Sequence, residues 1–580
     1  MRLKEWHKIA LIIILSLAGA YFFLRFFTRG ISEGAPQVVE NSILELTLSG
    51  EIAERTVDDP VIEAMGEPAE LSMQTLLQVI RKAKIDEKIT GIILRPLGMA
   101  MGWAKTEELR DALADFKSSG KPIYAYLEVA GNKEYYLATV ADSIVGLGSG
   151  MLFINGLASE PVFLKETLDK IGVEADFVAI GKYKNAPDMV TREDMSEAQR
   201  EVINSVLDQY YARFISTLAA ARNLDEAAVR GHIDRGYFSL NEARANGLID
   251  TVMYYNEFKE WLKERGEQKS YLVSWNRYKD VSFSQLGLAA KHTVAVVYGV
   301  GTIVIGGENQ FGQDGLITSE GMANSIRKAA EDKSVKAIIL RIDSPGGSGT
   351  ASDVIWREVV EARKQKPVIV SISDVAASGG YYISMAADTI VAHPNSIVGS
   401  IGVFAGKFAM KKLYDKIGMN KEVILRGKNA DIFSETRKFT PEQRELMYQA
   451  ILEFYRDFIG KVAEGRDMSA EAVDAIGQGR VWTGEQGLQN GLVDVLGDFD
   501  TAVKIAKRMS GIPEDEPVRL AVYPKLKTFL ERLFETGFPS DRVLETLFDW
   551  KQIPPAFRSI VPAIPYFRAG EPLYLYMYAF

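Results

Sequence analysis

The sequence contains no cysteine and only four histidines. Without cysteine, the chain cannot form a disulfide, a thiolate zinc site or a cysteine nucleophile. No H-E-x-x-H motif or carboxylate cluster is present, so we expect no metal and no cofactor. A Ser-His-Asp triad would have to use His232 or His393, and we expect His393 to pack or cap at the end of a strand. The net charge of −9, without a basic stripe, argues against nucleic acid as a partner.

One apolar run, residues 9–27, is long enough to span a bilayer. Three basic side chains lie in residues 1–8, which favours a cytoplasmic N-terminus and an exported chain. The small residues Ala18–Ala20 resemble a signal cleavage site, but apolar sequence continues beyond them. The sequence therefore favours a single uncleaved transmembrane anchor, followed by a linker over 28–41.

Beyond the linker, the chain repeats itself. Ile92–Arg95 recurs as Ile338–Arg341, and Asp169–Gly172 recurs at the same spacing as Asp415–Gly418. Such recurrence of short motifs in order indicates two copies of one domain in tandem.

The repeats set the expected domain boundaries. The first repeat covers 42–265, a connector covers 266–291, and the second repeat covers 292–510. The remaining residues, 511–580, are predicted to be a helical and aromatic tail that packs on the body or on another subunit, with contact to the membrane surface as the alternative. Each copy alternates strands and helices, which predicts α/β domains with largely parallel sheets.

The stretch Val368–Met385 reads as an apolar strand, a turn of small residues and a helix that opens at Tyr381. We expect Ser378 to be exposed at this corner, next to the unsatisfied N–H groups of the helix start. Ala376 and Gly380 occupy the flanking positions of a G-x-S-x-G elbow, so an α/β-hydrolase is disfavoured. For the corner alone, the alternative is a serine that caps a helix.

The two copies differ at this corner. Ser378 corresponds to Asn132 in the first copy, and the glycines of the loop Ser344–Ser348 have no counterpart there. Glycines between a strand and a helix free backbone N–H groups for an oxygen or an anion. Structural glycines would be expected in both copies, so their loss from one copy indicates a site that is used once per chain.

A serine nucleophile needs a base, and the histidines are poor candidates. Lysine can serve if its amine is neutral, as in Ser-Lys enzymes. Lys184 follows a predicted strand in the first copy, and Lys428 takes the corresponding place in the second. A lone lysine is more often a solvated surface residue, so these residues alone leave the base open.

Four motifs together resemble the signal peptide peptidase A family of the long, tandem-repeat type. They are Tyr183-Lys184, Asp343–Ser348, Ala377–Tyr381 and Gly399–Gly402. The resemblance covers the chain from the anchor to about residue 510. It implies an α/β fold with two tandem ClpP/crotonase-like domains after an N-terminal transmembrane helix. It also implies a homotetrameric serine endopeptidase, anchored in the cytoplasmic (inner) membrane with its catalytic part in the periplasm.

The same resemblance implies roles for individual residues. Ser378 would be the nucleophile and Lys184, from the other copy, the general base. Lys428 is the competing base, and it is disfavoured because it would have to serve a serine in its own copy. The implied substrates are cleaved signal peptides and other apolar peptides.

The resemblance further implies an oxyanion hole formed by the N–H groups of Gly346, Gly347 and Gly379. Ser400 would hold the lysine amine. Two other functions stay open: a crotonase-type acyl-CoA enzyme, which export of the chain disfavours, and a non-catalytic scaffold that binds peptides at the membrane.

Overall fold

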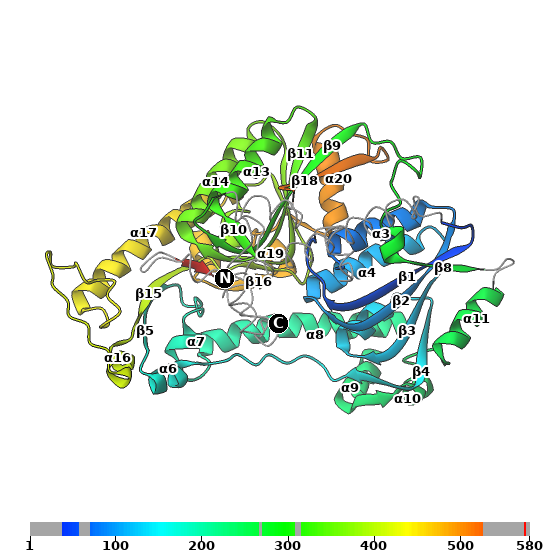
Figure 1. Ribbon diagram of the computed structural model, residues 1–580, viewed down its shortest axis with the longest axis horizontal. Helices are drawn as coiled ribbons and strands as arrows, with labels where there is room; N and C mark the ends of the chain where they lie inside the picture. Colours follow the sequence, from blue (N-terminus) through cyan, green and yellow to red (C-terminus); the bar gives the residue numbers. More distant parts are fainter. Residues whose placement is uncertain (1–37, 57–69, 266–269, 308–314, 526–572, 576–580) are drawn as a thin grey trace, which may run out of the picture.

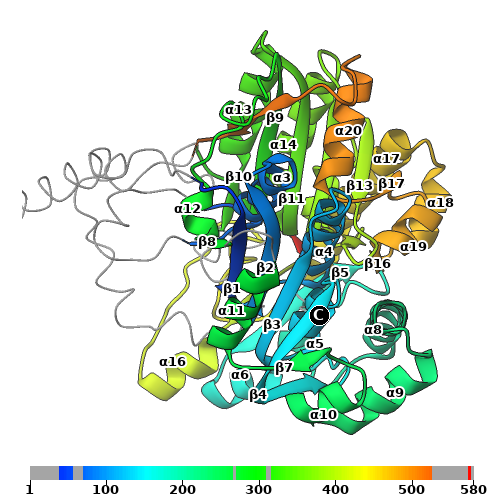
Figure 2. The same ribbon diagram turned by 90° about the vertical axis from the view of Figure 1, so that its right-hand side faces the viewer.

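The computed structural model describes residues 38–56, 70–265, 270–307, 315–525 and 573–575. In this part of the chain, two sheets lie next to each other and are covered by helices, and the sheet of the second repeat is drawn above that of the first (Figures 1 and 2). The predicted anchor, 9–27, and residues 526–572 and 576–580 of the predicted tail lie outside the described residues. Among the helices that are described, none is long and apolar enough to cross a membrane.

The first sheet has the strand order β6-β4-β3-β2-β1-β8, and its four central strands are parallel neighbours. Helices pack against it, so its apolar strand residues are buried on both faces, as in parallel sheets generally. Its strands are β1 Ser42–Glu51, β2 Ile89–Ala100, β3 Ile123–Ala130, β4 Ser143–Ile154, β6 Gly236–Ser239 and β8 Tyr271–Ser274, and the chief helices are α3 Met73–Ile85, α4 Trp103–Lys117, α5 Asn132–Ala138 and α8 Glu197–Arg222.

The second sheet repeats this plan around parallel β9, β11, β12 and β13. Its strands are β9 His292–Val304, β11 Val335–Ser348, β12 Val368–Ala377, β13 Thr389–Ala392, β14 Ile397–Gly399, β16 Val481–Thr483 and β18 Val518–Tyr523. Its main helices are α13 Ser319–Glu331, α14 Gly349–Arg363, α15 Gly379–Tyr382, α17 Pro441–Arg466 and α20 Phe499–Met509. The predicted α/β class is confirmed.

Repeated residues make repeated contacts in the two halves. The Tyr135 hydroxyl donates to the Leu248 carbonyl at 2.7 Å, and the Tyr381 hydroxyl donates to the Leu492 carbonyl at 3.0 Å. The long helices also start alike, because Ser196 caps α8 and Thr440 caps α17 through their side-chain oxygens. The sequence repeat is therefore a repeat of structure.

One strand of the first repeat belongs to the sheet of the second repeat. β5, Glu174–Ile180, belongs to the first repeat by sequence but pairs antiparallel with β15, Val403–Ala409, of the second sheet (Figure 1). Val178 and Ile180 on this strand are buried in the core of the second repeat. This exchange brings the residues after Ile180 to the end of β12.

The counterparts of these two strands do not pair in the structure. Helices α6, Lys165–Ile171, and α16, Lys411–Ile417, are equivalent and lie side by side (Figures 1 and 2). However, residues 157–163, the counterpart of β15, and residues 420–426, the counterpart of β5, contain no strand. Within 420–426, the Ile424 side chain is 84% exposed.

Parts of the predicted connector and tail join the sheets. Connector residues form β8 and α12, Trp275–Tyr278, and β8 pairs with β1. From the tail, β18 extends the second sheet beside β9, and β19, Leu573–Leu575, lies between β11 and β15. The described residues of the tail, 511–525 and 573–575, contribute these two strands to the body, and the rest of the predicted tail lies outside the described residues.

Candidate active site

Ser378 stands at the corner between β12 and α15, where the sequence predicted a strand-to-helix turn. Its backbone has φ 55° and ψ −114°, which non-glycine residues rarely adopt and which recurs at functional sites. Its N–H donates to the Gly399 carbonyl at 2.7 Å. The prediction that Ser378 is exposed was wrong: its exposed fraction is 0%, because residues from the first repeat lie over it.

Lys184 is the residue that covers Ser378. It follows β5 in a turn, in which its own N–H donates to the Gly181 carbonyl at 3.1 Å. The turn is docked on the second repeat, since the Tyr183 N–H donates to the Gln478 carbonyl at 2.7 Å. A Cβ at Gly479 would lie 2.5 Å from the Lys184 nitrogen, so a glycine is required for this approach.

The Lys184 amine lies among three oxygens. Its Nζ is 2.7 Å from Ser378 Oγ, 3.1 Å from Ser400 Oγ and 3.3 Å from the Ser400 carbonyl. A neutral amine has two N–H donors and one lone pair, which matches one contact to each Ser400 oxygen and one to the Ser378 hydroxyl.

Burial lowers the pKa of Lys184 well below its usual value. Among the described carboxylates, none forms an ion pair with this amine that would offset the loss of water. The lysine is therefore held in conditions that favour its neutral form. Lys428, the competing base, lies on an exposed turn beside the start of α17.

The three predicted oxyanion glycines gather at this corner. Gly346 and Gly347 have φ values of 101° and 153° at the end of β11, and Gly379 is the first residue of α15. A Cβ at Gly379 would lie 3.1 Å from the Gly347 nitrogen, so the two segments are in close contact. The Gly346 N–H already donates to Ser344 Oγ at 3.2 Å, which leaves the N–H of Gly379, at the start of a helix, better placed to receive an oxyanion.

A buried lysine in α4 ties the two repeats together behind this corner. Lys105 Nζ lies 2.6 Å from Asp343 on β11 and 3.4 Å from Asp374 on β12. Asp374 also accepts hydrogen bonds from the backbone N–H groups of Gly102 and Lys105. Sequence reasoning missed Lys105, because a single lysine in a helix carries no signal of burial.

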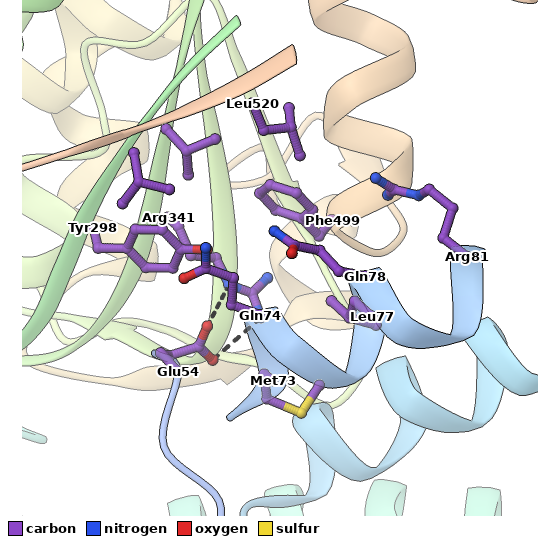
Figure 3. A pocket seen from close by; sticks show the side chains of 12 residues that line it. Glu54, Met73, Gln74, Leu77, Gln78, Arg81, Tyr298, Arg341, Phe499 and Leu520 are labelled. Atoms are coloured by element: carbon purple, nitrogen blue, oxygen red, sulfur yellow. Dashed lines mark hydrogen bonds and ion pairs between the residues drawn. The ribbon is translucent and has the colours of Figure 1, made fainter. Parts of the chain in front are cut away.

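A second buried ion-pair cluster lies next to the first. Arg341 contacts Glu54 at 2.9 Å and Glu108 at 2.5 Å, so both carboxylates come from the first repeat and the arginine from the second. Burial acts to raise the pKa of Glu54, but the charges of Arg341 and Lys105 outweigh it and lower that pKa to about 2. Figure 3 shows Glu54 and Arg341 in a pocket whose lining includes neither Ser378 nor Lys184.

Neither candidate histidine contacts Ser378. His393 is buried at the end of β13, where its ring nitrogens lie 2.7 Å from Glu107 and 3.0 Å from Asp111 of α4. The prediction that His393 packs at the end of a strand is confirmed. His232 lies edge-on to Phe238, with ring centroids 5.5 Å apart.

Comparison with known proteins shows the family of the chain. The model of the family described as Peptidase family S49 matches residues 115–269 and 361–512, one region in each repeat. The chain is 35% identical over 548 residues to the chloroplastic serine protease SPPA of Arabidopsis thaliana, covering 92% of this chain and 80% of that protein. It is 31% identical over 574 residues to Protease 4 of Salmonella typhi, covering 95% and 89%.

Among solved structures, the chain is similar to a membrane-bound stomatin-specific protease in complex with a substrate peptide. The TM-score is 0.26 at 18% identity, over 42% of this chain and 97% of that one. The identification comes from the sequence matches, which extend over both repeats. The chain belongs to peptidase family S49, and it is a serine peptidase of that family.

Proposed function

We propose that this chain is a membrane-anchored endopeptidase that cleaves signal peptides and other apolar peptides through a dyad of Ser378 and Lys184. The observation that carries the proposal is the 2.7 Å separation of Lys184 Nζ and Ser378 Oγ at a buried site. The two residues come from different repeats, which accounts for the loss of the serine and its glycines from the first copy.

In the first step, the lone pair of the Lys184 amine accepts the Ser378 proton while Oγ attacks the scissile carbonyl. The amine can act in this way because burial lowers its pKa. Ser400 fixes the orientation of the amine, because its carbonyl and its Oγ accept hydrogen bonds from the two N–H groups of Lys184. Ser400 is thus a positioning residue.

The tetrahedral oxyanion would be held by backbone N–H groups at Gly379 and at the end of β11. Lys184, now protonated, donates its proton to the leaving amine, and an acyl group remains on Ser378. The neutral lysine then activates a water molecule, which hydrolyses this ester and restores the hydroxyl.

The proposed substrate class rests on apolar surroundings and on the anchor. Ala186 and Phe404 are buried next to Phe177 beside the lysine turn, which suits an apolar peptide side chain. The apolar run at 9–27 would place the site at the inner membrane, with both repeats in the periplasm. Signal peptides that remain in the membrane after preprotein processing have this chemistry.

A fluorophosphonate probe tests the nucleophile, because stable labelling requires an activated hydroxyl. We expect one label per chain, on Ser378, and no labelling of Ser378→Ala. A non-catalytic scaffold would take up no label at any serine.

The base is tested by comparing two lysines. Lys184→Ala should reduce turnover of an apolar peptide by about a thousandfold or more, as loss of a general base within a concerted unit does. Lys428→Ala should retain substantial turnover, and it is the matched control because it occupies the same position in the other copy. If Lys428→Ala is inactive and Lys184→Ala is active, the dyad lies within one repeat and the proposal is wrong.

A further inference from the structure

β19 lies along the edge of β11 that carries the candidate oxyanion glycines. β12 pairs with β11 from Ile338 to Ser344 and then turns away toward Ser378. β19 takes up the vacated edge antiparallel, with Gly346 opposite Leu575 and Ser348 opposite Leu573. The segment therefore runs beside the nucleophile, and it also contacts α15, which begins at Gly379.

The other edge of β19 faces β15, the strand that begins just after Ser400. Phe404 on β15 is opposite Leu573 in an antiparallel pair. β19 thus lies in a slot between two strands. One is β11, which carries Gly346 and Gly347, and the other is β15, which follows Ser400. Figure 1 shows β19 as a short red strand beside β15.

The Leu573 side chain packs in an apolar cluster built from both repeats. It contacts the group formed by Phe177 on β5, Ala186 just after Lys184, and Phe404. The rings of Phe177 and Phe404 have their centroids 6.0 Å apart. We call this cluster, Phe177, Ala186 and Phe404, the apolar pocket.

We propose that the slot between β11 and β15 is the substrate-binding position, and that residues 573–575 are a built-in competitor that occupies it. This inference rests on the proposed function and adds to it a mode of regulation. Backbone pairing in such a slot is independent of sequence, so the apolar pocket selects the side chain. The segment itself, Leu-Tyr-Leu followed by Tyr-Met-Tyr-Ala-Phe, is an apolar peptide of the proposed substrate class.

A competitor in the same chain is present at an effective concentration in the millimolar range. A free peptide must displace it before cleavage, so the competitor raises the apparent KM and leaves kcat unchanged. Removing the competitor should lower KM by about tenfold or more, because the free substrate then binds without displacing a tethered segment.

The experiment compares the full chain in detergent with a chain that ends at Pro572, on an apolar peptide substrate. We expect the shortened chain to have a lower KM by about tenfold, the same kcat, and faster labelling by fluorophosphonate. Leu573→Asp in the full chain should act in the same direction, since a carboxylate is costly in the apolar pocket. Leu573→Met, the matched control, should keep the KM of the full chain.

A binding assay separates this inference from the proposed function. A fluorescent peptide of residues 573–580 is titrated against the shortened chain carrying Ser378→Ala, which cannot cleave it. We expect saturable binding that is lost with Phe404→Asp and with Ala186→Trp, which fills the pocket. Thermal unfolding establishes that both variants are folded.

The outcomes are distinct. If the peptide binds in the pocket but no variant cleaves any peptide, residues 573–575 do occupy a binding slot, and the proposed function is wrong. If the full and shortened chains cleave peptides with equal KM and the peptide does not bind, the inference is overturned while the peptidase stands.

Discussion

Lys184 obtains its unusual acid–base behaviour from the loss of water. It is buried, and its partners are two serines, so its protonated form lacks both solvent and a counter-charge. A charged amine would lose its hydration free energy in this site, and this cost favours the neutral amine.

This chemistry predicts the direction of the pH–rate profile. Only the neutral amine accepts a proton, so kcat/KM should rise with pH and level off above the lowered pKa of Lys184. The rising limb should lie well below the usual lysine value of 10.5. Initial rates over a pH series test this, and a limb near that value would contradict the burial argument.

The same burial predicts an effect on stability. Between the lowered pKa and 10.5, the unfolded chain binds more protons at this residue than the folded chain, so the free energy of unfolding rises with pH. Lys184→Met removes this dependence. The variant should be more stable than the wild type at neutral pH, and the difference should shrink as pH approaches 10.5.

Chemical denaturation at several pH values measures that difference. Lys428→Met provides the reference, because that side chain is exposed. Equal stability of Lys184→Met and wild type at neutral pH would mean that the folded state stabilises the charged amine.

How far the sequence could predict the site differs from residue to residue. Ser378 and the glycines could be found because one copy retains them and the other does not. The burial of Ser378 could not be predicted, because Lys184, which lies against it, is 194 residues away in the sequence. Lys105 and Glu54 could not either, since isolated charges in a sequence usually face water.

At the scale of elements, helix α4 joins the two repeats through charged side chains. Lys105 and Glu108 reach the strands β11 and β12, and Glu107 reaches His393 at the end of β13. The strands that carry the glycines and the serine are therefore positioned by a helix of the other copy.

Lys105→Met should be strongly destabilising. It would leave Asp343 and Asp374 buried without their cation, and breaking such a cluster costs about 3–5 kcal/mol. Lys117→Met, at the end of the same helix, should have little effect because its pair with Asp142 is partly exposed. Urea unfolding compares the two, and equal losses would show that Lys105 contributes no more than a surface pair.

His393 adds a pH-dependent link. Burial acts to lower its pKa, but hydrogen bonds and charge from Asp111 and Glu107 outweigh burial and raise it to about 9. A raised pKa gives stability that is complete below pH 6.5 and is lost as pH rises through about 9.

His393→Gln should therefore be less stable than wild type at pH 6, and the gap should close above pH 9. Unfolding curves at the two pH values measure it, and a gap independent of pH would contradict the ion-pair account. Fluorophosphonate labelling of Ser378 should persist in the variant, because this histidine moves no proton.

Elements also mark the limit of prediction from sequence. The capped helices α8 and α17 and the buried strand β12 follow from local patterns within one or a few residues. The exchange of β5 does not, because buried Val178 and Ile180 indicate an apolar face without indicating which repeat covers it. Pairing across copies is decided by tertiary contacts.

For the whole molecule, the unpaired segments suggest how copies of the chain assemble. Residues 157–163 and 420–426 are equivalent to β15 and β5, which pair within the chain. We propose that residues 420–426 of one copy pair with 157–163 of the next. Such a head-to-tail contact forms a ring when the rotation between neighbouring copies closes. The homotetramer that the sequence resemblance implies would be such a ring, with exposed Ile424 in its interface.

Ile424→Asp should weaken that assembly. Light scattering with size-exclusion chromatography should give a smaller mass for Ile424→Asp than for the wild type, whereas Ile424→Val should retain the wild-type mass. An unchanged mass for Ile424→Asp would remove residues 420–426 from the interface.

The strand exchange has a further consequence for the peptide link between the repeats. Because β5 and the lysine turn are held in the second sheet by backbone pairing, we expect the positions of Lys184 and Ser378 to survive a break in the covalent joint between the copies. The two repeats should therefore form the site even as separate chains. Cut near residue 290, either half alone should be inert, and the two halves produced in one cell should recombine and recover peptide cleavage.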